Sequence, residues 1–188
     1  MPEVFFKGAG VVSAKAWIHR ELGAATWAAC LAAMPPSIAT VYEQPLAFNW
    51  LPGEGLDAMF RTVAEQSGDR AKQDATLRAM GRYVAEDNLS TVYKMVLAVA
   101  KADHVFGLLP RLWLTYFKNI EVALMRGSGK SGTCIVHHAP ISFLGPAASG
   151  WIEFAYSKVG CADARVTEEA FESGKVKSDQ LRFLVRWS

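Results

Sequence analysis

The sequence predicts an α+β fold in which a helical layer of about six helices packs on a four-stranded, mainly antiparallel sheet. Apolar residues recur at helical spacing through 1–118, and the period changes to that of β-strands through 119–188. A run of helices followed by a run of strands is typical of the α+β class. With 188 residues, 51% of them apolar, the chain can bury one core. We therefore expect a single domain over 1–188, ending in a β-hairpin, a helix and a second β-hairpin.

The first helices are delimited by capping and breaking residues. Ser13 can cap a helix that runs to about Leu22, where Gly23 ends it. The alanine-rich run AATWAACLAAM has high helix propensity and ends at Pro35-Pro36. A short helix is predicted from Ser37, and the segment EQPLAFNWLPG is predicted to be an irregular connection with an aromatic face.

Apolar stripes predict the remaining helices of the first part. The stripe over 56–64 indicates a helix ending near Gly68, followed by a polar linker at 69–71. A second stripe begins at Leu77, and Asn88 interrupts or kinks it.

The stripe restarts with a new phase over 89–100, and the widest apolar stripe spans 105–117. Pro110 lies inside this last stripe, so the helix either starts there or bends there.

Two hairpins and a helix are predicted after that. Alternation over 120–125, the turn RGSGKSG and the run TCIVHH form the first hairpin. A helix follows over 148–159, with Gly160 in C-cap position. Strands near 164–172 and 180–187, joined by a turn at Ser173-Gly174, form the second hairpin. The last strand is the clearest, because its apolar residues alternate strictly: Leu181, Phe183, Val185 and Trp187.

Composition excludes several classes of function. A net charge of +2, with lysine and arginine interspersed among acidic residues, gives no strong field for nucleic acid or membranes. No apolar run reaches the ~20 residues that span a bilayer, and the N-terminus lacks the apolar region of a signal peptide. The three cysteines are far apart and form no CxxC motif. We expect a cytoplasmic protein.

Two motifs have a functional and a structural interpretation, and the structural one is favoured. GSGKSG resembles the end of a phosphate-binding loop, but Leu124 stands where the first glycine is needed and a strand follows instead of a helix. A hairpin turn explains it. His137 and His138 are adjacent in a strand and point to opposite faces, so they cannot ligate one metal ion. His19 and His104 have no carboxylate or cysteine at ligand spacing nearby.

No catalytic constellation is evident. Cys134 lies on a predicted strand and no histidine–aspartate partner can be assigned to activate it, so a core role is expected. Glu168 and Glu169 are adjacent in a strand and cannot act together as a general acid–base pair. Glu86-Asp87 is expected to be a solvated patch.

Large aromatic side chains are the feature that suggests a function. Most of them must fill the core, but a helical layer rich in aromatic and methionine side chains over a sheet is also how an apolar ligand cavity is lined. The candidate ligand-binding residues are Tyr93, Trp113, Tyr116, Phe117, Trp151 and Phe154.

The whole chain resembles an uncharacterised paralogous family best known from myxobacteria. The resemblance rests on patterns of hydrophobic and small residues in five segments: FKGAGVVSAKAWIHRELGAATWAACLAAMPP, LRAMGRYVAEDNLSTVYKMVL, LLPRLWLTYF, GWIEFAYSKVG and LRFLVRW. That family is similar to the 4-vinyl-reductase-type small-molecule-binding domain, whose wider group includes aromatic-compound sensors, haem-nitric-oxide-binding domains and subunits of a Golgi trafficking complex. The resemblance implies helices against an antiparallel sheet, enclosing an apolar pocket.

The sequence departs from the cofactor motifs of these relatives. Sensors of this type bind zinc with an ExxC…GDxxC pattern. Glu168 matches its glutamate, but Phe171 replaces the first cysteine and 178–181 offers no second one. Haem-binding relatives use YxSxR and a histidine on a helix, and the sequence YSKVG at Tyr156 does not match. We expect neither zinc nor haem, and no cofactor.

These observations lead to a non-catalytic regulatory or sensory module that binds an apolar or aromatic small molecule between helices and sheet. The alternative is a protein-interaction or scaffolding subunit without a ligand, possibly a homodimer, that uses Phe48 and Trp50 as its interaction surface. An enzyme using Cys134 is a third and weaker hypothesis.

Overall fold

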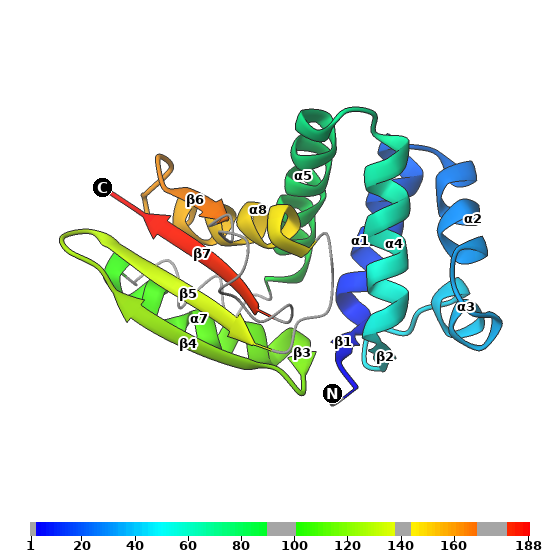
Figure 1. Cartoon of the computed structure of the whole chain (residues 1–188), viewed down its shortest axis with the longest axis horizontal. Coiled ribbons are helices and arrows are strands. Elements are labelled where there is room, and N and C mark those ends of the chain that lie inside the picture. The colour runs from blue at the N-terminus through cyan, green and yellow to red at the C-terminus, as the bar shows by residue number, and fades with distance from the viewer. Residues whose placement is uncertain (1–2, 90–100, 138–143, 169–179) are drawn as a thin grey trace, which may run out of the picture.

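The computed structural model describes residues 3–89, 101–137, 144–168 and 180–188. These residues form seven helices and two antiparallel sheets, which confirms the α+β class (Figure 1). The elements in chain order are β1 (Phe5–Lys7), α1 (Gly8–Glu21), α2 (Ala24–Ala32), α3 (Pro36–Glu43), β2 (Trp50–Pro52), α4 (Gly53–Gln66), α5 (Arg70–Asn88), α7 (Ala102–Tyr116), β3 (Phe117–Lys118), β4 (Glu121–Arg126), β5 (Ser131–His137), α8 (Leu144–Ser157), β6 (Arg165–Glu168) and β7 (Gln180–Arg186). The predicted stripe at 89–100 and turn at 173–174 lie outside the described residues.

The C-terminal sheet has the predicted four antiparallel strands, in the order β4-β5-β7-β6. The register places Cys134 opposite Phe183 and Val136 opposite Leu181. All four side chains are buried on the same face, as the strict alternation of the last strand predicts. The sheet therefore presents one apolar face to the helices.

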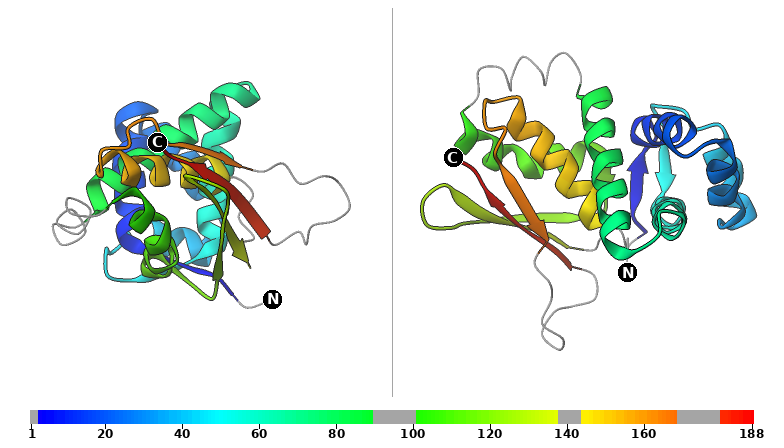
Figure 2. Two further views of the ribbon diagram at one scale, coloured as in Figure 1. Left: turned by 90° about the vertical axis from the view of Figure 1, so that its left-hand side faces the viewer. Right: turned by 90° about the horizontal axis from the view of Figure 1, so that it is seen from above.

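Helices α7 and α8 cover that face (Figure 2). Phe106 of α7 lies against the backbone of β5 at Gly132, where a Cβ atom would come within 2.3 Å of the ring. Phe106 also stacks on Trp187, with ring centroids 5.6 Å apart. A glycine near the start of β5 is thus a site of close approach by a helix.

A second, three-stranded sheet was not predicted. Its order is β2-β1-β3, and both pairs are antiparallel. These strands have three, three and two residues, too few to display a period in the sequence. The segment EQPLAFNWLPG, predicted to be irregular throughout, contributes β2 and the first residue of α4.

Several predicted helix boundaries were wrong. Helix α1 begins at Gly8, five positions before the predicted cap, and Ser13 lies inside it. Gly8 marks close packing, because a Cβ atom there would lie 2.1 Å from the carbonyl oxygen of Leu46. The predicted linker at 69–71 is the start of α5, where the Asp69 carboxylate accepts the backbone N–H of Lys72.

Two further helices begin earlier in the chain than predicted. Helix α7 runs unbroken from Ala102 through Tyr116 with Pro110 inside it, so a start at Pro110 is excluded. Helix α8 begins at Leu144, four residues earlier than predicted. Asn88 is the last residue of α5, which confirms the predicted interruption.

Helix α5 joins the N-terminal helices to the C-terminal part of the molecule. It contacts α1 and α4 on one side and α8 on the other (Figure 1). The approach to α8 is so close that a Cβ atom on Gly81 would lie 1.9 Å from the carbonyl oxygen of Ala147. A Cβ atom on Gly150 would lie 2.0 Å from that of Arg78. The two backbones are therefore in direct contact, as only glycine allows.

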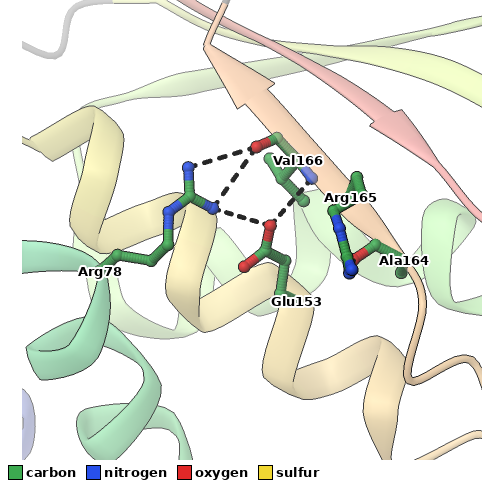
Figure 3. Close-up of polar contacts among 5 residues, drawn as sticks. All are labelled: Arg78, Glu153, Ala164, Arg165 and Val166. Atoms are coloured by element: carbon green, nitrogen blue, oxygen red, sulfur yellow. Dashed lines mark hydrogen bonds and ion pairs between the residues drawn. The ribbon is translucent and has the colours of Figure 1, made fainter. Parts of the chain in front are cut away.

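A polar network fastens the same crossing to the sheet (Figure 3). Arg78 of α5 donates to the Glu153 carboxylate of α8 over 2.7 Å. The same carboxylate oxygen accepts the backbone N–H of Val166 in β6 at 3.1 Å, and the Arg78 guanidinium reaches the Val166 carbonyl at 3.4 Å. One ion pair thus joins three elements, and its charge-assisted hydrogen bonds fix their relative positions.

We expect Gly81→Ala to lower the free energy of unfolding by about 1–3 kcal/mol, because the new methyl group meets the backbone of α8. Gly107→Ala is the matched control, since a Cβ atom there meets nothing within 4 Å. It should stabilise helix α7 by up to about 1 kcal/mol, from helix propensity. Chemical denaturation of the two variants measures both effects, and equal stabilisation by both would contradict the close crossing.

Candidate functional site

A cavity of about 70 Å³ lies between the N-terminal helices and the α7–α8 pair, beside the α5–α8 crossing. Helices α1, α4, α5, α7 and α8 contribute its wall, together with one residue each from β1 and β3. The described residues that line it are Phe6, Gly10, Ala14, Leu56, Met59, Phe60, Met80, Gly81, Val84, Leu112, Trp113, Tyr116, Phe117, Leu144, Ala147, Ala148, Trp151 and Ile152.

Four of the six candidate ligand-binding residues lie around this cavity: Trp113, Tyr116, Phe117 and Trp151. Phe154 is buried on α8 but is not among the described lining residues, and its ring lies beneath the cations of Arg82 and Lys158. Tyr93 lies outside the described residues. The structure therefore brings together the aromatic residues at the end of α7 and in the middle of α8.

The aromatic wall follows from helical spacing and one change of direction. Trp113 and Tyr116 are three residues apart on α7 and share one face of it. The chain then enters β3, where Phe117 turns inward and packs on Trp113 at 5.2 Å between ring centroids. Trp151 meets Tyr116 edge-on at 6.0 Å. These contacts hold the rings in fixed orientations.

The opposite wall is mainly aliphatic, with Phe6 and Phe60 as its aromatic members, and the sequence indicates only that these residues belong to the general core. Leu56 and Met59 of α4 and Met80 of α5 come from stripes that were correctly predicted as helical. Nothing distinguishes a residue that faces a cavity from one that faces a neighbour in such a stripe, because both positions are apolar. The smallest lining residues, Gly81 and Ala147, belong to the helix crossing.

One polar chain begins at the cavity wall. The Tyr116 hydroxyl donates to the carbonyl oxygen of Asn88 at 3.1 Å. The Asn88 amide donates to the Ser13 hydroxyl at 2.6 Å, and that hydroxyl donates to the Asp87 carboxylate at 2.5 Å. Tyr116 therefore places its ring against the cavity while its hydroxyl holds the end of α5, and Ser13 ties this end to α1.

The residues considered for catalysis or metal binding are placed elsewhere. Cys134 is buried on the face of β5 that the helices cover, and burial raises the pKa of its thiol to about 12, so the thiol is protonated at neutral pH. His137 on β5 interacts with the Gln180 side chain at 2.9 Å. His138 lies outside the described residues, which contain no group of three or more acidic, histidine or cysteine side chains able to hold a metal ion.

Glu168 and the glycine-rich turn GSGKSG are the last two features that the sequence suggested as functional. Burial is the main cause that raises the pKa of the Glu168 carboxyl. Gly129 lies in the turn between β4 and β5 with a φ of 66°, as a hairpin turn requires.

Within the described residues no helix is long and apolar enough to cross a membrane.

The two residues of the alternative interaction surface differ in exposure. Phe48 lies in the connection before β2 and is 72% exposed. Trp50 is the first residue of β2 and is partly covered by the side chains of Lys7 and Lys118, whose ammonium groups lie 4.8 and 4.3 Å from its ring centroid.

We expect Tyr116→Phe to lower the free energy of unfolding by about 0.5–1.5 kcal/mol, because it removes the hydrogen bond to Asn88 and keeps the ring. Protection of the last amides of α5 from hydrogen exchange should fall more than that of the α4 amides. Unchanged stability together with unchanged exchange at the end of α5 would contradict this role of the hydroxyl.

Comparison with known proteins identifies the fold. No family model and no curated protein sequence matches this chain. The structure of an unliganded Fe(II) H-NOX protein from K. algicida superposes with a TM-score of 0.69 at 8% identity, covering 97% of this chain and 96% of that one. An S. oneidensis H-NOX protein in the Fe(II)NO state gives 0.69 at 11% identity, covering 97% and 99%. An H-NOX mutant from T. tengcongensis gives 0.63 at 12% identity, covering 96% and 97%. At these identities the likeness concerns the fold alone: the chain has the H-NOX fold over nearly its whole length.

Proposed function

We propose that this protein is a sensory module that binds a small, uncharged, apolar molecule in the cavity between α4, α5, α7 and α8. The observation that carries the proposal is a hollow, almost wholly apolar site in the core, in a chain of this fold. Because interiors are normally close-packed, a void of this size forfeits contact energy unless something else fills it. The shared fold with H-NOX proteins, one of them solved in an Fe(II)NO state, supports a ligand-binding role.

The lining determines the chemistry of the proposed ligand. Tyr116 contributes the one titratable side chain among the described lining residues, and its hydroxyl is engaged with Asn88. A charged ligand would lose its hydration without gaining a partner here, which is strongly unfavourable. Affinity would come from apolar burial, at about 25 cal/mol per Å² removed from water.

The volume limits the size of the ligand. An engineered cavity of about 150 Å³ accepts benzene, and the cavity here has about half that volume, 70 Å³. The wall as it stands therefore suits a molecule smaller than benzene. An aromatic ligand would require a flexible lining residue such as Met59 or Met80 to move, and methionine adapts readily because its side chain is unbranched.

Haem does not fit the described lining. A porphyrin is much larger than benzene, and the cavity is already smaller than benzene needs. The described lining contains no histidine or cysteine to ligate iron and no lysine or arginine to pair with the propionates. We therefore propose no role for haem in this protein.

We propose no catalysis by the module itself. The Cys134 thiol that was considered as a nucleophile is buried and protonated, a state that is inert. The three described cysteines are all unpaired and buried, which suits a reducing compartment such as the cytoplasm.

The test is a size series of apolar ligands, cyclopropane, benzene and indole, with the binding of each measured by ligand-observed NMR. We expect saturable binding of cyclopropane to the natural protein. Ala148→Leu should abolish it, because the larger side chain fills the void. Leu112→Ala should extend binding to benzene while lowering the free energy of unfolding by about 2–5 kcal/mol.

Two outcomes would contradict the proposal. One is the absence of saturable binding in both the natural protein and Leu112→Ala, with circular dichroism showing both to be folded. The other is equal binding by the natural protein and Ala148→Leu, which would place the ligand elsewhere.

A further inference from the structure

The three-stranded sheet has an apolar inner face and a mixed outer face. Phe6 and Phe117 point inward, where both line the cavity and pack together at 4.8 Å between ring centroids. Side chains alternate along a strand, so their neighbours Lys7 and Lys118 lie on the opposite face. Trp50 pairs with Lys7 across the ladder and lies on that face too. We call the surface formed by Phe5, Lys7, Trp50, Pro52 and Lys118 the outer face.

Two cations converge on one ring of the outer face. The ammonium groups of Lys7 and Lys118 lie 4.8 and 4.3 Å from the centroid of Trp50. Each contact is a cation–π interaction, worth a modest amount at an exposed site. The two like charges also repel each other, and an anion bound beside them would relieve that repulsion.

No carboxylate offsets this pair among the described ion pairs, none of which includes Lys7 or Lys118. Lys7 instead donates to the carbonyl oxygen of Phe48 at 3.1 Å. Glu3 is the nearest acidic residue along β1, and it is exposed beyond the end of the strand. The outer face therefore presents net positive charge around an aromatic ring.

An exposed apolar edge adjoins the outer face. The connection that leads into β2 carries Leu46, which is 50% exposed, and Phe48, which is 72% exposed. Its backbone is held in place, since the N–H groups of Gly8 and Ala9 donate to the carbonyl oxygens of Asn49 and Ala47. These apolar side chains are thus presented on an ordered connection, which the Lys7 ammonium group contacts at the carbonyl oxygen of Phe48.

We propose that the outer face binds an acidic segment of a partner protein, with carboxylates paired to Lys7 and Lys118 and an apolar side chain against Phe48 and Trp50. The small number of lysines on the outer face favours a peptide over nucleic acid or a membrane. Nucleic-acid binding typically neutralises about 6–10 phosphates, and anionic membranes are bound by clusters of about 4–8 basic residues. Two lysines beside exposed aromatic groups suit a short acidic and apolar peptide. This interaction is independent of the cavity.

The test is selection of a random-hexapeptide phage library on the immobilised full-length protein. Enriched peptides should combine aspartate or glutamate with an aromatic or aliphatic residue. A labelled copy should bind in fluorescence anisotropy, more weakly at high salt. The double variant Lys7→Glu/Lys118→Glu should weaken binding at least about tenfold and should favour basic peptides in a repeated selection. Phe48→Ser should also weaken binding.

The matched control is Lys72→Glu/Lys158→Glu, which changes the net charge equally at exposed lysines on other elements. Lys158 is a close match because its ammonium group also lies over a ring, that of Phe154 at 4.6 Å. The control should bind the peptide as the natural protein does. Equal loss in both double variants, enrichment of peptides without acidic residues, or no enrichment at all would overturn the proposal. Tight binding to phosphatidylserine vesicles that depends on Lys7 and Lys118 would also overturn it, by replacing the protein partner with a membrane.

Discussion

The backbone contact between α5 and α8 is the constraint on which the rest of the structure depends. Gly81 and Gly150 let the two helices approach until each would place a Cβ atom on the carbonyl group of the other helix. Helix α5 carries the N-terminal helices on its far side, and α8 covers the sheet (Figures 1 and 2). The close crossing therefore sets the distance between the two halves of the fold. The Arg78–Glu153 pair adds orientation, because it reaches β6 as well.

The same crossing accounts for the hollow beside it. Gly81, Ala147 and Ala148 are small because the helices touch, so they project little into the space next to the contact. The facing residues Trp113 and Tyr116 are rigid rings held by neighbouring aromatic groups, and rigid rings cannot spread into a small gap. An apolar cavity follows from placing small residues opposite rigid ones. Its apolar lining is what gives the proposed ligand its chemistry.

The three-stranded sheet separates two kinds of surface. Phe6 and Phe117 face the cavity, while the next residues along each strand, Lys7 and Lys118, face outward. One wall of three short strands thus divides the apolar site from the charged aromatic face. The proposed ligand site and the proposed partner surface therefore lie within a few residues of each other.

Much of the architecture could be predicted from the sequence, and the reasons for the exceptions are physical. Leu181, Phe183 and Val185 alternate so regularly that the last strand and its buried face were predicted correctly. The sheet at β1, β2 and β3 was missed because two or three residues show no period. The early start of α1 was missed because Gly8, normally a helix breaker, is there for close packing against Leu46.

Only the aromatic part of the candidate site could be predicted from the sequence. Trp113, Tyr116, Phe117 and Trp151 were named because large rings on one helical face are visible in a sequence. Met59 and Met80 were not, because lining and packing positions have the same apolar character. Phe154 shows the converse limit: its helical position placed it among the ring residues of α8, but its ring lies under Arg82 and Lys158.

A crystal structure of the protein under xenon pressure would show directly whether the cavity can hold an apolar guest. Xenon is apolar and enters dry cavities. We expect one strong xenon peak between Met80, Leu112 and Ile152, with the surrounding side chains in place. Side chains that fill this space, with no peak among them, would contradict it.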